Sequence, residues 1–538
     1  SPTQGDDYLR AQAAFIRQTY DSVAELPDTT TATKGAGRIG FNYALAYAAG
    51  TIGKWLQDLA TSAGAAFIGF SNAVLYAAGT VGKSLQDRAV SVTDAPYLAD
   101  NTGVVDASTA FQAALSAFKN VVIPPGIYKI GTSLTMIDGQ TLPGLGRPQL
   151  VAVTAGQHIL SASAKSNVSV FGVRFKGLNS GTAPLSSIGG FASTSTGLLT
   201  IVAGSDIRVE ECEFDTFYNG CSVINCDRVW VEKNRITNWL VYGVLASLSK
   251  RFNIDHNDIK GCNQSGAVSA YGISATGDEN GANIQTVNSI SFNNIANIPS
   301  WDGIMTHDVS GLRVIGNDIR DVRIGLDIGH VLSTNFVRDV VIGLNYIEST
   351  ATNTWGATPA LHGGILVTGF DGTHQVDGLI VQGNEVKNFF TTAAMVLTGN
   401  AANIAVGYTN RAVISGNRVR NTGTINAAPG IYVIGQNDGV VVQGNSLEGA
   451  MTPGAVRFAN VIADSAVIAG NTIKQTTTSD PAVQITGSTV TSLAVDANAH
   501  NSTIPFVQST STLTQANSGV FTATLTGCAT SPTANCQW

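Results

Sequence analysis

VIGNDI, at residues 314–319, is one of ten similar phrases that recur along this chain of 538 residues. Each phrase has apolar residues at its first and sixth positions, and nine of the ten have asparagine at the fourth. The ten phrases are VEECEF (209–214), VEKNRI (231–236), IDHNDI (254–259), ISFNNI (290–295), VIGNDI (314–319), IGLNYI (342–347), VQGNEV (381–386), ISGNRV (414–419), VQGNSL (442–447) and IAGNTI (468–473). Their fourth positions lie 22 to 39 residues apart. Repeats of this length are typical of a solenoid, because a unit that cannot bury its own apolar face must stack on its neighbours.

The phrase indicates a strand that ends in a turn, because its two apolar positions flank a polar bend. Asparagine tolerates the left-handed backbone of such bends, and stacked identical asparagines can hydrogen-bond along the pile. A second, weaker phrase follows most copies: NGCSVI (219–224), YGVLAS (242–247), YGISAT (271–276), DGIMTH (302–307), IGLDIG (324–329), GGILVT (363–368) and PGIYVI (429–434). We therefore predict an all-β fold, a right-handed single-stranded parallel β-helix with at least two strands in each coil.

The coils differ in length, and the longest lie between about residues 257 and 417. Where a coil exceeds the shortest repeat of 22 residues, the surplus must leave the solenoid as a loop. In repeat proteins such loops often gather on the binding face. We expect the binding face in this part of the chain.

The composition excludes several functional classes. The net charge is −7 and the sequence has no cluster of basic residues, which argues against binding to nucleic acid. The sequence also has no uninterrupted apolar run long enough to span a membrane. The six cysteines form no Cys-x-x-Cys motif, so we expect no metal site and no cofactor. Cys212 and Cys221 are predicted to be small buried thiols. Cys528 and Cys536 lie close enough in sequence to be bridged, which the sequence leaves open.

The chain before the repeats has a different character. Residues 6–26 indicate a helix with an apolar seam from Leu9 to Val23. A direct repeat follows, in which residues 40–58 and 69–87 share 13 of 19 positions. We predict that this repeat forms a neck that associates with copies of itself. The predicted segments are an N-terminal helix and linker (1–39), the neck (40–91), the β-helix (92–500) and a β-rich C-terminal segment that is incomplete (501–538).

The β-helix is expected to begin with a helix that covers its open end. In DASTAFQAALSAF (106–118), Phe111, Leu115 and Phe118 share one helical face behind capping candidates Asp106 and Ser108. VVIPPGIYKI (121–130) then gives a strand, a turn and another strand. A helix at this position protects strand edges that would otherwise invite aggregation.

Three landmarks carry a family resemblance. DASTAFQAALSAF followed by VVIPPGIYKI resembles the opening of the pectate-lyase-like superfamily of β-helices. GTVGKSLQDRAVSVTDA (79–95) resembles the neck of bacteriophage tailspikes, and SGVFTATLTGCATSP (518–532) is similar to the start of a small β-sandwich at tailspike C-termini. The resemblance implies a homotrimer on the phage virion, attached to the tail or baseplate through its N-terminal region, that binds and depolymerises a bacterial surface polysaccharide outside the host cell. None of the three landmarks carries catalytic residues.

Two other functions remain open on the sequence alone. One is a tail adhesin that binds capsule or O-antigen polysaccharide without cleaving it. The other is a secreted uronan lyase or epimerase, against which the duplicated neck argues. The acidic calcium cluster and catalytic arginine of pectate lyases cannot be placed here, although IDHN (254–257) resembles one of their phrases. DGI (302–304) faintly resembles polygalacturonases, whose other signatures are missing, so hydrolase and lyase both stay open, with a glycoside hydrolase slightly favoured.

Sugar cleavage requires either two carboxyl groups about 5 to 10 Å apart or a base with a group that neutralises a uronate. Alignment of the second phrase on its glycine puts Asp302 one place before the glycine and Asp327 two places after it in the next coil. His307 lies four places after the first of these glycines. We predict that Asp302 and Asp327 are the acid and its partner carboxylate, and that His307 orients the substrate or exchanges protons. The alternative is that these residues are solvated polar positions on an outer face.

Aromatic and polar residues near these positions are candidates for contacts with the glycan, because aromatic faces can stack on sugar rings. The predicted substrate-binding residues are Trp301, Tyr271, Tyr242, Trp239, His330, Glu348 and Trp355. Further candidates are Asp308, His362, Asp371 and His374. Asp371 and His374 could form a metal or acid–base pair, although this spacing is common by chance. Aromatic residues in turns are also ordinary packing.

Overall fold

A computed structural model describes residues 89–178, 197–263, 270–277, 287–329, 337–349, 363–389, 402–421, 428–452, 454–476, 480–496, 498–501, 507–509 and 512–518. The chain divides into two compact units, residues 1–89 and residues 90–538. The predicted helix at 6–26, the predicted neck repeat, and Cys528 and Cys536 lie outside the described residues. They stay predictions.

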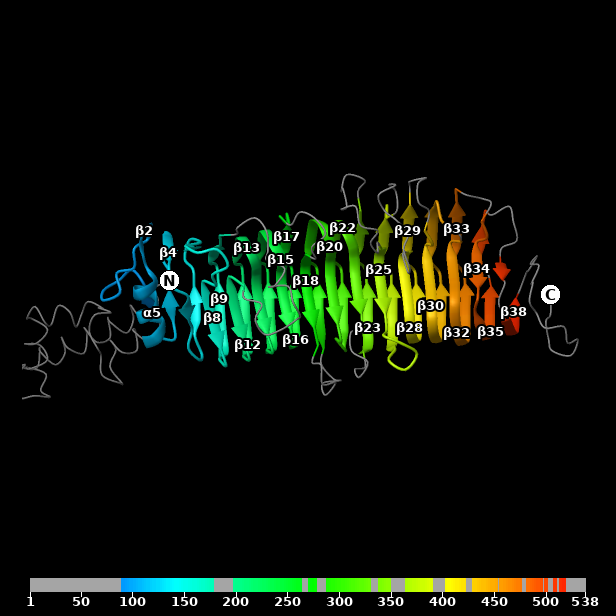
Figure 1. Cartoon of the computed structure of the whole chain (residues 1–538), viewed down its shortest axis with the longest axis horizontal. Coiled ribbons are helices and arrows are strands. Elements are labelled where there is room, and N and C mark those ends of the chain that lie inside the picture. Colours follow the sequence, from blue (N-terminus) through cyan, green and yellow to red (C-terminus); the bar gives the residue numbers. More distant parts are fainter. Residues whose placement is uncertain are drawn as a thin grey trace, which may run out of the picture. The chain divides into compact units, whose positions relative to one another are not determined.

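The second unit is a parallel β-helix (Figure 1). Within the described residues, thirty-six strands form one continuous hydrogen-bonded set, and each strand away from its two ends pairs in parallel with strands one coil before and one coil after it. A separate short pair, β1 (Val90–Ser91) and β3 (Val121–Val122), precedes them. Each coil contributes three strand segments, and stacking of the coils produces three sheets, named here in the order in which a repeat runs through them.

The first sheet contains the strand that ends at the asparagine turn. Its members are β6 (Thr141–Pro143), β9 (Ser166–Phe171), β12 (Ser205–Glu210), β14 (Asp227–Glu232), β16 (Lys250–Asp255), β19 (Asn288–Ser291), β21 (Leu312–Ile315), β23 (Val337–Gly343), β26 (Val376–Gln382), the second halves of β28 (Ala402–Ser415), β30 (Ile431–Gln443) and β32 (Val456–Ala469), β35 (Thr489–Asp496) and β38 (Thr512–Ser518).

The second sheet follows the asparagine turn. Its members are β2 (Thr102–Asp106), β4 (Ile127–Ile130), β7 (Gln149–Ala152), β10 (Arg174–Lys176), the first halves of β13 (Glu213–Ile224), β15 (Arg235–Ser247), β20 (Asn294–His307) and β22 (Asp318–Gly329), β17 (Asp258–Lys260), β24 (Tyr346–Glu348), β27 (Glu385–Lys387), β29 (Arg418–Asn421), β31 (Ser446–Gly449), β33 (Thr472–Gln475) and β36 (Ala499–His500).

The third sheet contains the second sequence phrase. Its members are β5 (Leu134–Thr135), β8 (Leu160–Ser163), β11 (Leu199–Val202), β18 (Tyr271–Thr276), β25 (Gly363–Thr368), β34 (Val483–Thr486), β37 (Val507–Ser509), the second halves of β13, β15, β20 and β22, and the first halves of β28, β30 and β32. The prediction of at least two strands per coil is therefore confirmed, and a third strand is added.

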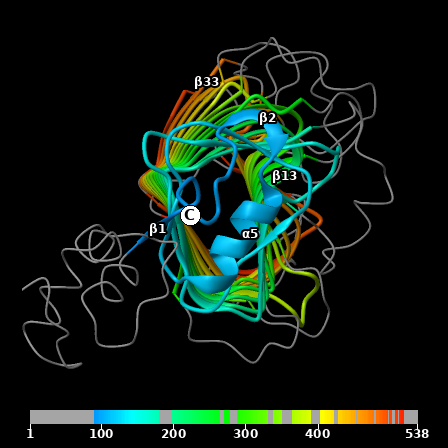
Figure 2. The same cartoon turned by 90° about the vertical axis from the view of Figure 1, so that its left-hand side faces the viewer.

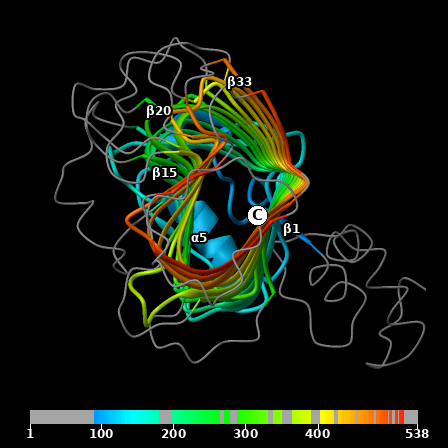
Figure 3. The same cartoon turned by 90° about the vertical axis from the view of Figure 1, so that its right-hand side faces the viewer.

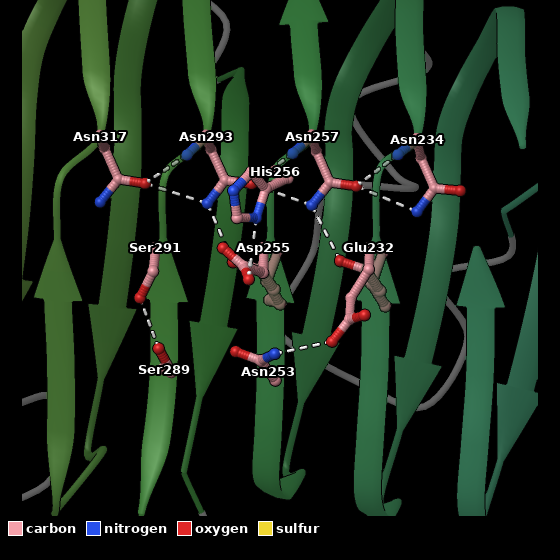
Figure 4. Close-up of polar contacts among 12 residues, drawn as sticks. Glu232, Asn234, Asn253, Asp255, His256, Asn257, Ser289, Ser291, Asn293 and Asn317 are labelled. Carbon is pink, nitrogen blue, oxygen red and sulfur yellow. Dashed lines mark hydrogen bonds and ion pairs between the residues drawn. The ribbon is translucent and has the colours of Figure 1, made fainter. Parts of the chain in front are cut away.

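The asparagines of the repeat form a buried ladder at the turn between the first and second sheets (Figure 4). Asn317 is typical and is 1% exposed. Its side-chain amide donates to Asn345 Oδ1 at 2.9 Å and to the Ile290 carbonyl at 2.9 Å. Its own Oδ1 accepts from the backbone and side-chain amides of Asn293, both at 3.0 Å. Each asparagine thus satisfies buried backbone groups of neighbouring coils, which would otherwise lose hydrogen bonds on leaving water.

The ladder extends beyond the predicted repeats at one end. Asn498 Oδ1 accepts from the backbone amide of Asn471 at 2.9 Å. This copy, VDANAH (495–500), has the apolar residue Val495 at its first position but His500 at its sixth. At the other end, the backbone amide of Cys212 donates to Asn234 Oδ1 at 2.9 Å. Cys212, Cys221 and Cys226 are buried free thiols, as expected for the first two.

The core fills the interior of the stack with rows of aliphatic side chains. The first position of the phrase supplies one row: Val209, Val231, Ile254, Ile290, Val314, Ile342, Val381, Ile414, Val442 and Ile468, all of them buried. The sixth position supplies a second row: Phe214, Ile236, Ile259, Ile295, Ile319, Ile347, Val386, Val419, Leu447 and Ile473. Full burial of each such side chain contributes roughly 1.5 to 3 kcal/mol relative to exposure.

A helix, α5 (Ser108–Ala117), lies across the N-terminal end of the stack (Figure 2). Phe111, Ala114 and Leu115 are buried in the core, and the Phe111 ring meets the Tyr128 ring edge-on at 5.1 Å. The helix begins after Ala107, and the Asp106 carboxylate accepts the Ser108 backbone amide at 2.9 Å. The predicted terminal helix is confirmed. The view from the opposite end shows the coils superposed along the axis (Figure 3).

Candidate functional site

Several long connections of the chain directly precede or follow strands of the third sheet. Between the second and third sheets, residues 261–270 join β17 to β18, and residues 349–362 join β24 to β25. Between the third and first sheets, residues 277–287 join β18 to β19. By contrast, residues 344–345 alone join β23 to β24 at the asparagine turn. The predicted catalytic residues lie on this third sheet.

Asp302 lies at the bend of β20, where the pairing with β22 shifts register. Its side chain is fully buried, and neither carboxyl oxygen has a hydrogen-bond partner within the described residues. Burial raises the pKa of Asp302 well above its usual range, the negative charge of Asp327 raises it further, and the positive charge of Arg323 opposes both. A carboxyl group in such surroundings keeps its proton to higher pH than an exposed aspartate does, because the charged form is poorly solvated.

Asp327 lies on the next coil, in register with Met305. It is therefore one coil and three residues from Asp302, which corresponds to about 11 Å between Cα atoms, from about 4.8 Å between coils and 3.3 Å per residue. The side chain is half-buried. Burial raises the pKa of Asp327 to about 6. The two carboxyl groups thus differ in environment, with Asp302 enclosed and Asp327 partly exposed.

Arg323 and Trp301 stack beside Asp302. The guanidinium carbon of Arg323 lies 4.0 Å from the centre of the Trp301 ring, and Arg323 is 8% exposed. Burial lowers the pKa of Arg323, while the charge of Asp302 and the Tyr271 hydroxyl raise it. Sequence reasoning identified Trp301 but missed Arg323. The signal was present, because Arg323 precedes the phrase IGLDIG just as Trp301 precedes DGIMTH.

His307 lies on the same coil as Asp302 and pairs with Thr276 before it and Gly329 after it. A Cβ atom added at Gly329 would lie 3.6 Å from His307 Nδ1, so the imidazole rests over this glycine. Burial lowers the pKa of His307 to about 4. At neutral pH the ring is therefore uncharged and able to accept a proton. From the register, its Cα lies about 8 Å from that of Asp327.

Two of the predicted sugar-stacking aromatics, Tyr242 and Tyr271, stack on each other at 5.3 Å between ring centres. Tyr242 is only 5% exposed and packs with Leu240 and Leu245, and burial raises its pKa to about 12. Tyr271 is half-buried and lies closer to the carboxyl pair. Because the rings of Tyr242 and Tyr271 pack against each other, one face of each ring is covered.

Trp239 does not fit the predicted role. Its side chain is fully buried in the core, and the indole N–H donates to the Tyr271 carbonyl at 3.0 Å. An aromatic platform for a sugar must be open to solvent on one face. The prediction that Trp239 binds substrate is therefore wrong. The left-handed backbone of Asn238, with a φ of 60°, breaks the strand alternation just before Trp239 and leaves its side chain inward.

Glu348 lies on the second sheet rather than the third. It accepts a hydrogen bond from the Tyr346 hydroxyl at 2.6 Å and one from the Asn388 side-chain amide at 3.2 Å. Lys387 and Arg320 lie over the Tyr346 ring at 4.5 and 4.7 Å. Glu348 thus belongs to a polar cluster on a different face from Asp302. His330, Trp355 and His362 lie outside the described residues and stay predictions.

Asp371 and His374 form a turn. Asp371 Oδ1 accepts the backbone amides of Thr373 at 2.8 Å and His374 at 2.9 Å, and it lies 2.9 Å from His374 Nδ1. These hydrogen bonds, with the one from the Thr373 hydroxyl, lower the pKa of Asp371 well below its usual range. A carboxylate held in this way shapes a loop and makes a poor proton donor.

Asp308 is half-buried in the turn after β20 with a left-handed φ of 56°.

Within the described ranges, no group of three or more His, Cys, Asp or Glu side chains could hold a metal ion. No helix in these ranges is both long and apolar enough to cross a bilayer.

Comparison with known proteins finds similarity in structure alone. No protein-family model and no curated protein matches the sequence. Among solved structures, the Dettilon tailspike protein has a TM-score of 0.44 at 16% identity, with 80% of this chain and 70% of that chain covered. The surface adhesin PfbA of Streptococcus pneumoniae has a TM-score of 0.46 at 13% identity, with 80% and 100% covered.

A third similar structure is the A-module of the mannuronan C-5 epimerase AlgE6 of Azotobacter vinelandii. Its TM-score is 0.36 at 15% identity, with 80% of this chain and 99% of that chain covered. The names of these three proteins describe different functions: a tailspike protein, a surface adhesin and an epimerase. The chain is thus structurally similar to parallel β-helix proteins that include phage tailspikes, adhesins and alginate epimerases.

Proposed function

We propose that this protein binds a bacterial surface polysaccharide on the outer face of the third sheet and cleaves its glycosidic bonds. The observation that supports cleavage is the pair Asp302 and Asp327: two carboxyl groups on adjacent coils, both with a raised pKa. A raised pKa near neutrality is what a general acid requires, since the group must hold its proton and still release it.

The two carboxyl groups are suited to different roles. Asp302, in which burial favours the protonated form, donates its proton to the glycosidic oxygen as the carbon–oxygen bond breaks. Asp327, ionised above its pKa of about 6, accepts a proton from the water that attacks the anomeric carbon. His307, uncharged at neutral pH, orients the substrate or exchanges protons with solvent. One product keeps the glycosidic oxygen as a hydroxyl group with the proton from Asp302, and the other gains the hydroxyl group of water at its anomeric carbon. The proton taken up by Asp327 is released to solvent, and Asp302 regains one from solvent.

The second candidate function is binding without cleavage. It is favoured by the full burial of Asp302, because a polymer must reach a general acid within hydrogen-bonding distance. Cleavage therefore requires local displacement of the side chains that enclose Asp302. Binding requires only the half-buried residues of this face, among them Trp301, Tyr271 and Asp327.

We propose further that the protein acts as a homotrimeric phage tailspike, attached to the tail or baseplate through its N-terminal region. The support for this proposal is the tailspike resemblance of residues 79–95 and 518–532, together with the neck duplication. The glycan would be a capsule or an O-antigen on the host surface.

The test is degradation of a panel of purified capsular and O-antigen polysaccharides by the full chain. New reducing ends and a fall in polymer mass indicate hydrolysis, whereas ultraviolet absorbance from an unsaturated product indicates elimination and recasts His307 or Tyr271 as the base. Asp302→Asn and Asp327→Asn should each lower turnover by about a hundredfold or more while glycan retention stays unchanged.

The matched control is Asp371→Asn, which removes a carboxylate from a neighbouring turn outside the pair. Trp301→Ala should weaken glycan retention, because it removes the aromatic face beside the pair. Cleavage at the parental rate by both aspartate variants would refute this site. Retention of a glycan that is never shortened would establish the adhesin function instead.

A further inference from the structure

Arg457 lies on the outer face of the third sheet, near the C-terminal end of the stack. It belongs to β32 and pairs in register with Tyr432 of β30 on one side and with Gln484 of β34 on the other (Figure 1). Its neighbours in the strand, Val456 and Phe458, are fully buried in the core. Because successive side chains of a strand point to opposite faces, the Arg457 side chain points outward.

The Arg457 side chain is positioned without an ion pair. Its guanidinium carbon lies 5.2 Å from the centre of the Tyr432 ring, which is within the range of a cation–π contact. Among the described residues, no carboxylate forms an ion pair with Arg457, and its Nε atom is enclosed without a hydrogen-bond partner. By contrast, Arg420 on the second sheet has its Nε atom 3.2 Å from Glu448 Oε2. Arg457 thus has a half-buried guanidinium that the described residues do not neutralise.

A second unpaired polar atom lies one coil away. Gln484 is half-buried, and its Oε1 atom is enclosed with no hydrogen-bond partner in the part of the chain that the structure describes. Because Arg457 and Gln484 pair in register on adjacent coils, their backbones are about 4.8 Å apart. Buried polar groups in folded proteins are normally hydrogen-bonded, and an unpaired one is costly. A donor and an acceptor left unpaired side by side indicate a place where a ligand completes the hydrogen bonds.

The surrounding face leaves the positive charge of Arg457 unopposed. Four coils from β28 to β34 contribute to this part of the third sheet, through residues 402–407, 431–434, 456–459 and 483–486. These segments contain no acidic residue, and Arg457 is their only charged residue. A charge among apolar and uncharged neighbours is less screened than a charge in water. The face is therefore complementary to an anion.

We propose that Arg457 and Gln484 form a subsite for a carboxylate-bearing sugar of the polysaccharide. This inference rests on the proposed function and narrows its substrate to acidic glycans. A guanidinium matches a carboxylate in shape, because it donates two parallel hydrogen bonds, here from Nε and one Nη of Arg457. Gln484 Oε1 accepts a hydrogen bond from a hydroxyl group of the same sugar. Tyr432 is nearly buried and holds the guanidinium in place from one side.

The subsite is separate from the carboxyl pair. The outward row that contains Asp327 continues coil by coil through Leu366, Ala405 and Tyr432 to Arg457. Arg457 is four coils beyond Asp327, or about 19 Å at about 4.8 Å per coil. Leu366 and Ala405 are apolar and buried, so the polar positions at the two ends of this row are distinct subsites. An acidic sugar bound at Arg457 is remote from the reacting bond and strengthens binding of the glycan without altering the chemical step.

The experiment measures glycan retention by the full chain after removal of one charge, either at the subsite or elsewhere. The test variant is Arg457→Gln, and the control is Arg420→Gln, which removes the same charge from the second sheet. The probes are the polysaccharides of the panel that the parental protein retains, and the same polysaccharides after chemical reduction of their carboxyl groups to alcohols. Affinity electrophoresis gives the dissociation constant, and thermal melting followed by circular dichroism confirms folding.

The parental protein should retain acidic polysaccharides, and Arg457→Gln should weaken this retention by about tenfold or more, because charge-assisted hydrogen bonds are lost. Arg420→Gln should retain them like the parental protein. The reduced polysaccharides should bind equally to the parental protein and to Arg457→Gln. For a glycan that is cleaved, Arg457→Gln should raise KM and leave kcat unchanged, because the subsite is remote from the reacting bond.

Retention that is limited to neutral polysaccharides, or that is unchanged in Arg457→Gln, would overturn this inference and leave the proposed function intact. An equal loss of retention for native and reduced polysaccharides would also overturn it, since Arg457 would then act on the fold. A panel of which no polysaccharide is retained or cleaved would contradict the proposed function itself, and this inference with it. If Arg457→Gln does not fold, Arg457→Lys keeps the positive charge without the planar fork, and it must still weaken retention of the unreduced acidic polysaccharide alone.

Discussion

Replacement of Asn317 by leucine tests the asparagine ladder at its middle. The leucine fills a similar volume but cannot hydrogen-bond. The backbone amide of Asn293 loses its acceptor, Asn317 Oδ1 at 3.0 Å, and the Ile290 carbonyl loses its donor, Asn317 Nδ2 at 2.9 Å. Each buried backbone group left without this partner costs about 1 to 3 kcal/mol, so the variant should lose about 2 to 6 kcal/mol of unfolding free energy.

The matched control is Asn498→Leu at the end of the ladder. Asn498 makes the same kinds of bond, accepting from Asn471 and donating to the Ile468 carbonyl, but it is only partly buried. Water can replace its hydrogen bonds, so this change should cost clearly less than the change at Asn317.

Two measurements report the contribution of the asparagine ladder to stability. Urea unfolding followed by circular dichroism compares overall stability, and hydrogen exchange by mass spectrometry compares protection of the segment that contains Asn293. The middle variant should unfold at lower urea and exchange faster at that segment. Equal urea midpoints for the parental protein and both variants, with unchanged protection, would refute the reasoning.

Two further predictions concern buried titratable groups. The pKa of Asp327 is raised to about 6 in the folded state from a usual value of 3.8, so the unfolded chain releases its proton first and stability should fall as pH rises through this window. Asp327→Asn should therefore melt at a higher temperature than the parental protein at pH 7 and at nearly the same temperature at pH 3; an equal difference at both values would contradict this. Burial raises the pKa of the Cys212 and Cys226 thiols, to about 12 for Cys212, so native protein should leave both unmodified by iodoacetamide at pH 8 while urea-unfolded protein reacts. Rapid labelling of either thiol in the native state would show that the core opens.

The fold could be predicted because one short phrase carries the three pieces of information that a coil needs. Its first and sixth residues define the inward face on either side of a turn, and its asparagine defines the turn. In VIGNDI, Val314 and Ile319 are buried in the core and Asn317 joins the ladder. The register of the second phrase was also predictable, because Gly303 and Gly325 align as expected when Ile304 pairs with Leu326.

The candidate site was less predictable because burial on an outer face depends on residues far away in sequence. Strand alternation correctly turned Asp327 toward the outside, but it could not show that Asp302 is fully enclosed. It also could not show the inward position of Trp239, which follows the left-handed residue Asn238, where alternation breaks. Arg323 was overlooked because an arginine gives no periodic signal, and only the register with Trp301 shows its place.

The corners of each coil differ in how much inserted sequence they can accept. The turn at each asparagine has two residues, and a longer insertion there would break the row of amides that joins neighbouring coils. The connections from the second sheet to the third are longer at some coils, since 14 residues lie between β24 and β25 and 14 between β27 and β28. New segments can therefore be exchanged at one corner without altering the register at another. Under the proposed function, recognition and folding are encoded in different parts of each repeat, so a lineage can acquire new targets while it keeps the same scaffold.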